Sequence, residues 1–140
     1  MSALETQFEG LTTEQLKGFK TGRSNIVATL SKLCFNDQYF NRAGKLLFRL
    51  ALAENKEYSN NATGQFTQLF QLYLPGTEAS YTQRIHLLNW CLECTSDSLD
   101  LILGAIRNAL KLRGFFRGGD GEIRGLRKPY VDYRLSLIHI

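Results

Sequence analysis

The sequence contains few of the residues that carry catalysis or covalent cross-links. Its 140 residues include three cysteines, two histidines, two prolines and one tryptophan. An odd number of cysteines does not indicate a disulfide framework, and the absence of any run of 18 apolar residues argues against a transmembrane helix. The first residues also lack the basic and apolar regions of a secretory signal. We therefore expect a cytoplasmic protein with no membrane segment.

The scarce thiol and imidazole groups do not follow the spacing of a metal site. Cys91 and Cys94 form a Cys-x-x-Cys pair, and the other candidate ligands are Cys34 and His86. A structural zinc site takes four ligands, commonly from two such pairs, and a redox pair of this spacing follows a strand. We expect buried or incidental thiols, no cofactor and no enzymatic activity. A small zinc-stabilised domain is the alternative.

Apolar residues recur at spacings of three and four, which predict helices rather than strands. The stretch 41–77 is the central feature of the predicted fold, because it contains two helical segments with apolar stripes on either side of a polar turn. Neither helix can bury its stripe alone, so each must pack on a neighbour. The first stripe comprises Phe40, Ala43, Leu47, Leu50 and Ala51, and the second comprises Phe66, Leu69, Phe70 and Tyr73.

Polar residues that cap helix N-termini divide the rest of the chain. Residues 1–11 show no period and predict a loose lead-in, whereas Pro75-Gly76 predicts the end of a helix that runs through Leu74. The predicted caps are Thr12 with Gln15, Ser24, Asn36 or Asp37, Asn60 or Asn61, Ser80 with Gln83, and Thr95. The remaining predicted stripes are Ile26, Val27, Leu30, Leu33 and Cys34, then Ile85, Leu88 and Leu92, then Leu99, Ile102, Leu103, Ile106 and Leu110.

These patterns predict an all-α fold in which antiparallel helical hairpins stack as a short HEAT-like α-solenoid. Residues 1–23 form a lead-in with one short helix, and residues 24–112 form the helical-repeat core. Residues 113–134 form an irregular segment rich in glycine and arginine. We expect its Phe115-Phe116 pair to plug the end of the stack, where it partly covers Leu99, Ile102, Ile106 and Leu110 and otherwise leaves them open.

The last six residues, Leu135–Ile140, resemble a translated laboratory DNA sequence rather than part of a natural protein. They match the translation of a transposon mosaic-end adapter used to prepare sequencing libraries. We expect this tail to be non-native and the chain to be a fragment whose gene continues past Arg134. His139 is therefore left out of every site hypothesis.

Positive charge is concentrated near the C-terminus. The whole chain has a net charge of +4, and residues 107–134 hold eight basic and three acidic side chains. Such a basic stretch is typical either of a solvated surface or of a contact with nucleic acid or another anionic partner. The candidate partner-binding residues are Arg113, Arg117, Arg124, Arg127 and Lys128.

The succession of caps and core positions resembles the helical-repeat region that follows the ATPase module in large bacterial STAND-type NTPases. Many of those multidomain signalling ATPases are implicated in antiphage defence. The resemblance implies a scaffold, sensor or oligomerisation segment that contacts other domains of its own chain or another protein. The Walker motifs of that class are absent, so it implies no ATPase activity here. It is carried by Thr21–Val27, Phe40–Ala43, Leu50-Ala51, Asn60–Gly64, Leu74–Ala79, Gly125–Pro129 and Asp132-Tyr133.

Overall fold

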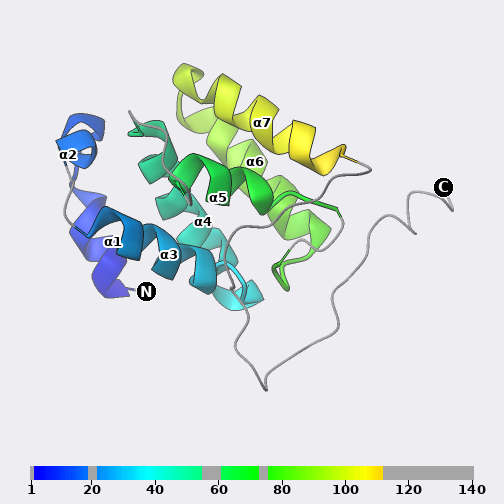
Figure 1. Cartoon of the computed structure of the whole chain (residues 1–140), viewed down its shortest axis with the longest axis horizontal. Coiled ribbons are helices and arrows are strands. Elements are labelled where there is room, and N and C mark those ends of the chain that lie inside the picture. The colour runs from blue at the N-terminus through cyan, green and yellow to red at the C-terminus, as the bar shows by residue number, and fades with distance from the viewer. Residues whose placement is uncertain (1, 19–21, 55–60, 73–75, 112–140) are drawn as a thin grey trace, which may run out of the picture.

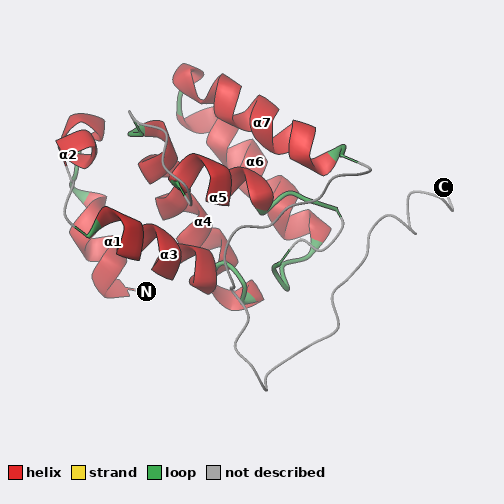
Figure 2. Cartoon of the chain, in the orientation of Figure 1, coloured by secondary structure: helices red, strands yellow, loops and turns green. Residues whose placement is uncertain are grey.

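The structure is a computed structural model that describes residues 2–18, 22–54, 61–72 and 76–111. Within those ranges every regular element is a helix and none is a strand (Figures 1 and 2). The predicted all-α class is therefore confirmed for this part of the chain. The predicted segments 113–134 and 135–140 lie outside the described residues. The elements are α1 (Ser2–Glu9), α2 (Thr13–Gly18), α3 (Arg23–Leu33), α4 (Asp37–Leu52), α5 (Ala62–Gln68), α6 (Tyr81–Cys94), the 3₁₀ turn η1 (Ser96–Ser98) and α7 (Leu99–Ala109).

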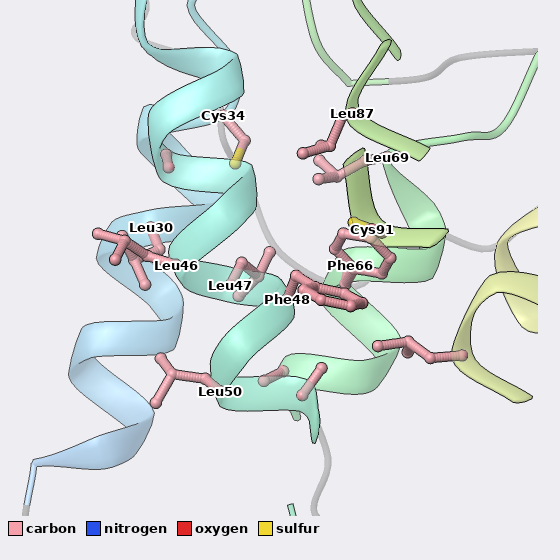
Figure 3. Packing of buried hydrophobic residues seen from close by; sticks show 14 of the residues in the cluster. Leu30, Cys34, Leu46, Leu47, Phe48, Leu50, Phe66, Leu69, Leu87 and Cys91 are labelled. Atoms are coloured by element: carbon pink, nitrogen blue, oxygen red, sulfur yellow. The ribbon is translucent and has the colours of Figure 1, made fainter. Parts of the chain in front are cut away.

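Helix α4 lies at the centre of the packing and contacts α2, α3, α5 and α6. Its N-terminus is capped as predicted, because the side chain of Asn36 accepts a hydrogen bond from the backbone N–H of Gln38 at 2.9 Å. All five residues of its predicted stripe are buried. Figure 3 shows Leu30 of α3 and Phe66 of α5 on either side of this helix. Helix α4 therefore joins the two sides of the core.

Aromatic rings connect α4 to α5 and α6. The ring centroids of Phe48 and Phe66 are 5.5 Å apart, and those of Phe66 and Phe70 are 5.2 Å apart. Trp90 of α6 meets Phe48 edge-on at 5.9 Å, and the ammonium group of Lys45 lies 4.6 Å from the Trp90 ring centroid. Tilted and edge-on geometries are those that aromatic pairs favour, so this cluster fixes the relative positions of three helices.

A glycine permits the close approach of α4 and α6. A Cβ atom added to Gly44 would lie 2.5 Å from Cδ2 of Leu87, whose side chain is itself almost fully buried. No real side chain fits at that distance without displacing Leu87. The absence of a side chain at Gly44 therefore determines how tightly the two helices pack.

The N-terminal segment differs from its prediction, because it forms helix α1 rather than an irregular lead-in. Glu5 forms an ion pair with Arg42 of α4, and Phe8 is 4% exposed. Arg49 of α4 donates a hydrogen bond to the carbonyl of Phe8 at 2.7 Å. An eight-residue helix is marginal by itself, so these distant contacts stabilise it, and the local sequence period does not reveal them.

Most predicted helix starts are confirmed, and one is wrong. Thr12 and Gln15 form the expected reciprocal pair, with the Thr12 N–H donating to Gln15 Oε1 at 2.8 Å and the Gln15 N–H donating to Thr12 Oγ1 at 3.3 Å. Asn61 also caps α5 as predicted. Ser24, however, lies inside α3, which begins at Arg23 after Gly22 with φ 76°. Glycine adopts this left-handed conformation at little cost, so the chain enters α3 without a side-chain cap.

Helix α5 ends at Gln68, well before the predicted end at Leu74. The chain leaves the helix because α6 provides other partners for its carbonyls. Arg84, which is 2% exposed, donates from Nη1 to the carbonyls of Leu69 at 3.4 Å and Gln71 at 2.8 Å. Carbonyls at a helix end need such partners. Tyr73, the last residue of the predicted stripe that begins at Phe66, lies outside the described residues.

Replacement of Phe66 by alanine tests the central role of the aromatic cluster. Phe66 is fully buried and touches the rings of Phe48 and Phe70. We expect Phe66→Ala to lower the free energy of unfolding by about 3–5 kcal/mol, because it removes apolar contacts and leaves a cavity. Urea unfolding followed by far-UV circular dichroism measures this loss. The exposed Leu110→Ala serves as a control, and similar losses in both variants would contradict the assignment.

Candidate interaction surface

Helix α6 is fixed at its first turn by the predicted capping box. Ser80 Oγ accepts from the N–H of Gln83 at 3.2 Å, and Gln83 Oε1 accepts from the N–H of Ser80 at 2.8 Å. The amide of Gln83 also donates to the carbonyl of Asp37 at 3.1 Å. The start of α6 is thus attached to the start of α4. The stripe predicted for α6 is partly wrong, because Leu92 is 53% exposed while Arg84, Leu87 and Cys91 are buried.

Thr95 begins the connection to α7, as predicted. Its hydroxyl accepts from the N–H of Asp97 at 3.3 Å, and its carbonyl accepts from the buried hydroxyl of Ser98 at 2.7 Å. Helix α7 packs on α5 and α6. A Cβ atom at Gly104 would lie 3.3 Å from Cγ2 of Thr67, so α7 and α5 approach each other closely. The side chains that α7 buries are Leu101, Ile102 and Ala105.

Helix α7 carries a second apolar stripe that faces solvent. Leu99, Leu103, Ile106 and Leu110 are 57%, 43%, 40% and 70% exposed, and we call these four residues the α7 outer face. The prediction that these four residues form one inward-facing stripe with Ile102 is wrong, because Ile102 is buried and they are exposed, whereas the expectation that Leu99, Ile106 and Leu110 are partly left open agrees with their exposure. The physical reason is that α7 has two stripes with helical spacing, and α5 and α6 cover only the one that contains Leu101 and Ile102.

An apolar groove lies between α6 and α7, beside the C-terminal end of the outer face. Its volume is about 160 Å³ and its surface is almost wholly apolar. We call it the α6–α7 groove. The exception to its apolar character is Arg84, whose buried guanidinium group also holds the carbonyls that follow α5. The apolar side chains that line the groove are Phe70, Tyr81, Ile85, Leu88, Ile106, Ala109 and Leu110.

A second cavity, of about 400 Å³, lies on the other side of α6 and has a more polar wall. It brings Trp90 and Cys94 together with Arg49 and Asp97. Arg49 is already engaged there, since it donates to the carbonyls of Phe8 and Leu11 at 2.7 and 2.5 Å. Its role in attaching α1 to α4 is therefore structural. We assign no reaction to this cavity.

The three cysteines are free thiols, and Cys34 and Cys91 are buried whereas Cys94 is exposed. Burial raises the pKa of Cys34, and burial together with the neighbouring Cys94 raises the pKa of Cys91 to about 12. Burial also raises the pKa of Cys94. Across the described residues, no three histidine, cysteine, aspartate or glutamate side chains are grouped so as to hold a metal ion.

The predicted partner-binding residues Arg113, Arg117, Arg124, Arg127 and Lys128 lie outside the described residues. Of the basic stretch, Arg107 and Lys111 are described, and both are exposed at the C-terminal end of α7. Within the described ranges, none of the helices combines the length and apolar character of a membrane span.

We find no match between this chain and any protein-family model, curated protein or solved structure.

The α6–α7 groove and its buried cation were not predicted from the sequence. One signal for Arg84 was present, because it lies three, four and seven positions before Leu87, Leu88 and Cys91. An arginine that continues the apolar stripe of a helix has its aliphatic stem in the core, and its guanidinium group then needs carbonyl partners. The groove itself is formed by the approach of α6 to α7, which no local pattern specifies.

Thiol alkylation tests the placement of the cysteines. We expect iodoacetamide to modify Cys94 in the folded protein and to modify Cys34 and Cys91 only after unfolding in urea. The thiolate is the reactive form, and the pKa of Cys94 is raised. The pH at which alkylation of Cys94 reaches half its maximal rate should therefore be higher than for a cysteine in a peptide. Mass spectrometry of the time course gives both results. Cys94→Ser should abolish the fast phase, and rapid native modification of Cys34 would contradict the placement.

Proposed function

We propose that this chain is a non-enzymatic helical scaffold or sensor segment that makes contacts with another protein or with other domains of its own chain. In this proposal it is a HEAT-like, cytoplasmic part of a larger bacterial signalling or defence NTPase. The observation that carries the proposal is the α7 outer face, which presents four exposed apolar side chains in one row. A helix with apolar residues on two sides is typical of a position between two layers of packing.

The energetics favour a contact within one longer chain. Burying a large aliphatic side chain contributes about 1.5–3 kcal/mol. The four residues are already about half-buried, so covering them adds roughly 4 kcal/mol. Association of two separate molecules costs an estimated 4–15 kcal/mol in lost freedom. The outer face alone is therefore too small for a stable complex in trans, but it suffices where a covalent link has already reduced that cost.

The stacking of helix pairs in a solenoid supports the same interpretation. Each repeat in such a protein covers the apolar surface of its neighbour, and a terminal repeat normally carries a polar outer surface. The α7 outer face lacks that polar character. The resemblance to STAND-type NTPases and the adapter-like tail both lead to the expectation of a longer gene, in which further helices after residue 134 cover this face.

The proposal is tested in the protein encoded by the uninterrupted gene. We expect the reading frame of adapter-free genomic DNA to continue beyond residue 134, and a stop codon directly after the codons for residues 135–140 would contradict this. In the long protein, we expect Leu103→Glu to lower the thermal unfolding midpoint, because it places a charge in a buried contact.

Leu92→Glu is the matched control, because Leu92 is a similarly exposed leucine on α6 outside the α7 outer face. In the isolated 140-residue chain, neither substitution should change the midpoint by more than a small amount, since both side chains face solvent. Equal effects of the two substitutions in the long protein would refute the assignment of the outer face as a packing surface.

A second candidate function is nucleic-acid binding. It is motivated by Arg107 and Lys111, which are exposed at the end of α7 where the basic stretch 107–134 continues. This function predicts that the chain binds DNA or RNA at low salt and that its affinity falls steeply as the salt concentration rises, because binding to phosphates releases counterions. Fluorescence anisotropy at 50 and 200 mM salt measures this. The quadruple charge reversal at Arg113, Arg117, Arg124 and Arg127 should abolish binding, and no retention at 50 mM would rule this function out.

A further inference from the structure

The cavity of about 400 Å³ beside Trp90 has the size and character of a site for a small organic molecule. Pockets that bind such ligands have volumes from about 300 to 1,000 Å³, and they combine apolar walls with a few polar groups. We call this space the Trp90 cavity, and α2, α4, α6 and η1 contribute to it. Its apolar side chains are Phe48, Leu52 and Trp90, and its polar ones are Thr13, Arg49, Cys94, Thr95 and Asp97.

The apolar wall provides a fixed surface for an aromatic ring. The ring centroids of Trp90 and Phe48 are 5.9 Å apart in an edge-on arrangement, and the ammonium group of Lys45 lies 4.6 Å from the Trp90 ring centroid. These contacts hold the half-buried indole in one orientation. A ligand ring in the cavity can add a third aromatic group to this pair, in the offset or edge-on geometry that aromatic rings favour.

Two opposite charges lie in the polar wall, and they do not neutralise each other. Arg49 donates to the carbonyls of Phe8 and Leu11 at 2.7 and 2.5 Å, which leaves three of its five N–H donors. The exposed carboxylate of Asp97 forms no ion pair or hydrogen bond, with Arg49 or with any other described residue. A cation that is already held in place and an anion without a partner therefore border the same cavity.

We propose that the Trp90 cavity binds a free aromatic amino acid. The ligand carboxylate pairs with the remaining N–H donors of Arg49, its ammonium group pairs with Asp97, and its ring packs against Trp90. Hydrogen bonds between charged groups are stronger than those between neutral ones. An amine without a carboxylate would bring a positive charge towards Arg49 with no compensation, and an acid without an ammonium group would bring a negative charge towards Asp97. A zwitterion matches both.

This binding site goes beyond the scaffold function and does not depend on it. None of the residues that line the Trp90 cavity belongs to the α7 outer face, so either surface can be disproved without affecting the other. The proposal is also separate from catalysis, since it requires the ligand to bind and not to react.

Truncated ligands test each charge without altering the protein. The probes are L-phenylalanine, phenethylamine, which lacks the carboxylate, 3-phenylpropionate, which lacks the ammonium group, and L-alanine, which lacks the ring. We expect each of the last three to bind the full 140-residue chain more weakly than L-phenylalanine, by roughly five-fold where one ion pair is lost. Isothermal titration calorimetry measures the four affinities.

A matched pair of variants then assigns the ammonium contact. Asp97→Asn keeps the shape of the side chain and the backbone bond to Thr95, and it should remove the preference for L-phenylalanine over 3-phenylpropionate. Asp100→Asn should keep that preference, because Asp100 is a similarly exposed carboxylate outside the cavity. Circular dichroism confirms that both variants are folded.

The thiol of Cys94 gives an independent measurement, because this exposed side chain lines the same cavity. Saturating L-phenylalanine should slow its alkylation by iodoacetamide several-fold, as followed by mass spectrometry, and should not do so in Asp97→Asn at the same ligand concentration. The proposal is overturned if L-phenylalanine neither binds saturably nor protects Cys94, if the truncated ligands match its affinity, or if the two variants behave alike.

Discussion

The close contact between α4 and α6 is the constraint on which the other helices depend. It is possible because Gly44 has no side chain, so that Leu87 packs directly against the α4 backbone. Once the two helices are this close, Phe48 reaches both Phe66 of α5 and Trp90 of α6. Helix α7 then takes its position from α5 and α6. Because α7 packs on α5 and α6 through the stripe that contains Leu101 and Ile102, its outer face stays exposed.

Arginine side chains connect the ends of helices across this core. Arg23 donates to the carbonyls of Leu16 and Leu50, at 3.2 and 2.6 Å, and so links α2, α3 and α4. Arg49 and Arg84 make the same kind of contact for α1 and α5, as described above. Each guanidinium group has five N–H donors in a rigid plane, which suits it to carbonyls that have no partner within their helix. Packing brings the helices together, and these contacts provide donors for carbonyls near the helix ends.

The parts of the fold that follow from local chemistry were predictable from the sequence. The capping pairs at Thr12 and Ser80 and the buried stripe of α4 depend on residues three or four positions apart, and the structure confirms them. The features that were missed depend on distant partners. Helix α1 forms through Arg42 and Arg49, and α5 ends early because of Arg84. The two stripes of α7 are equally helical in spacing, so only the position of the neighbouring helices decides which stripe is buried.

The single tryptophan has a consequence for observing this molecule in solution. Trp90 is half-buried at the contact between α4 and α6, with the ammonium group of Lys45 over its ring. Indole emission depends on both solvent exposure and nearby charge, so separation of α4 from α6 changes the wavelength and intensity of the signal. Because no second tryptophan contributes, that signal comes from one position. The chain thus carries its own optical probe for the contact between its two central helices.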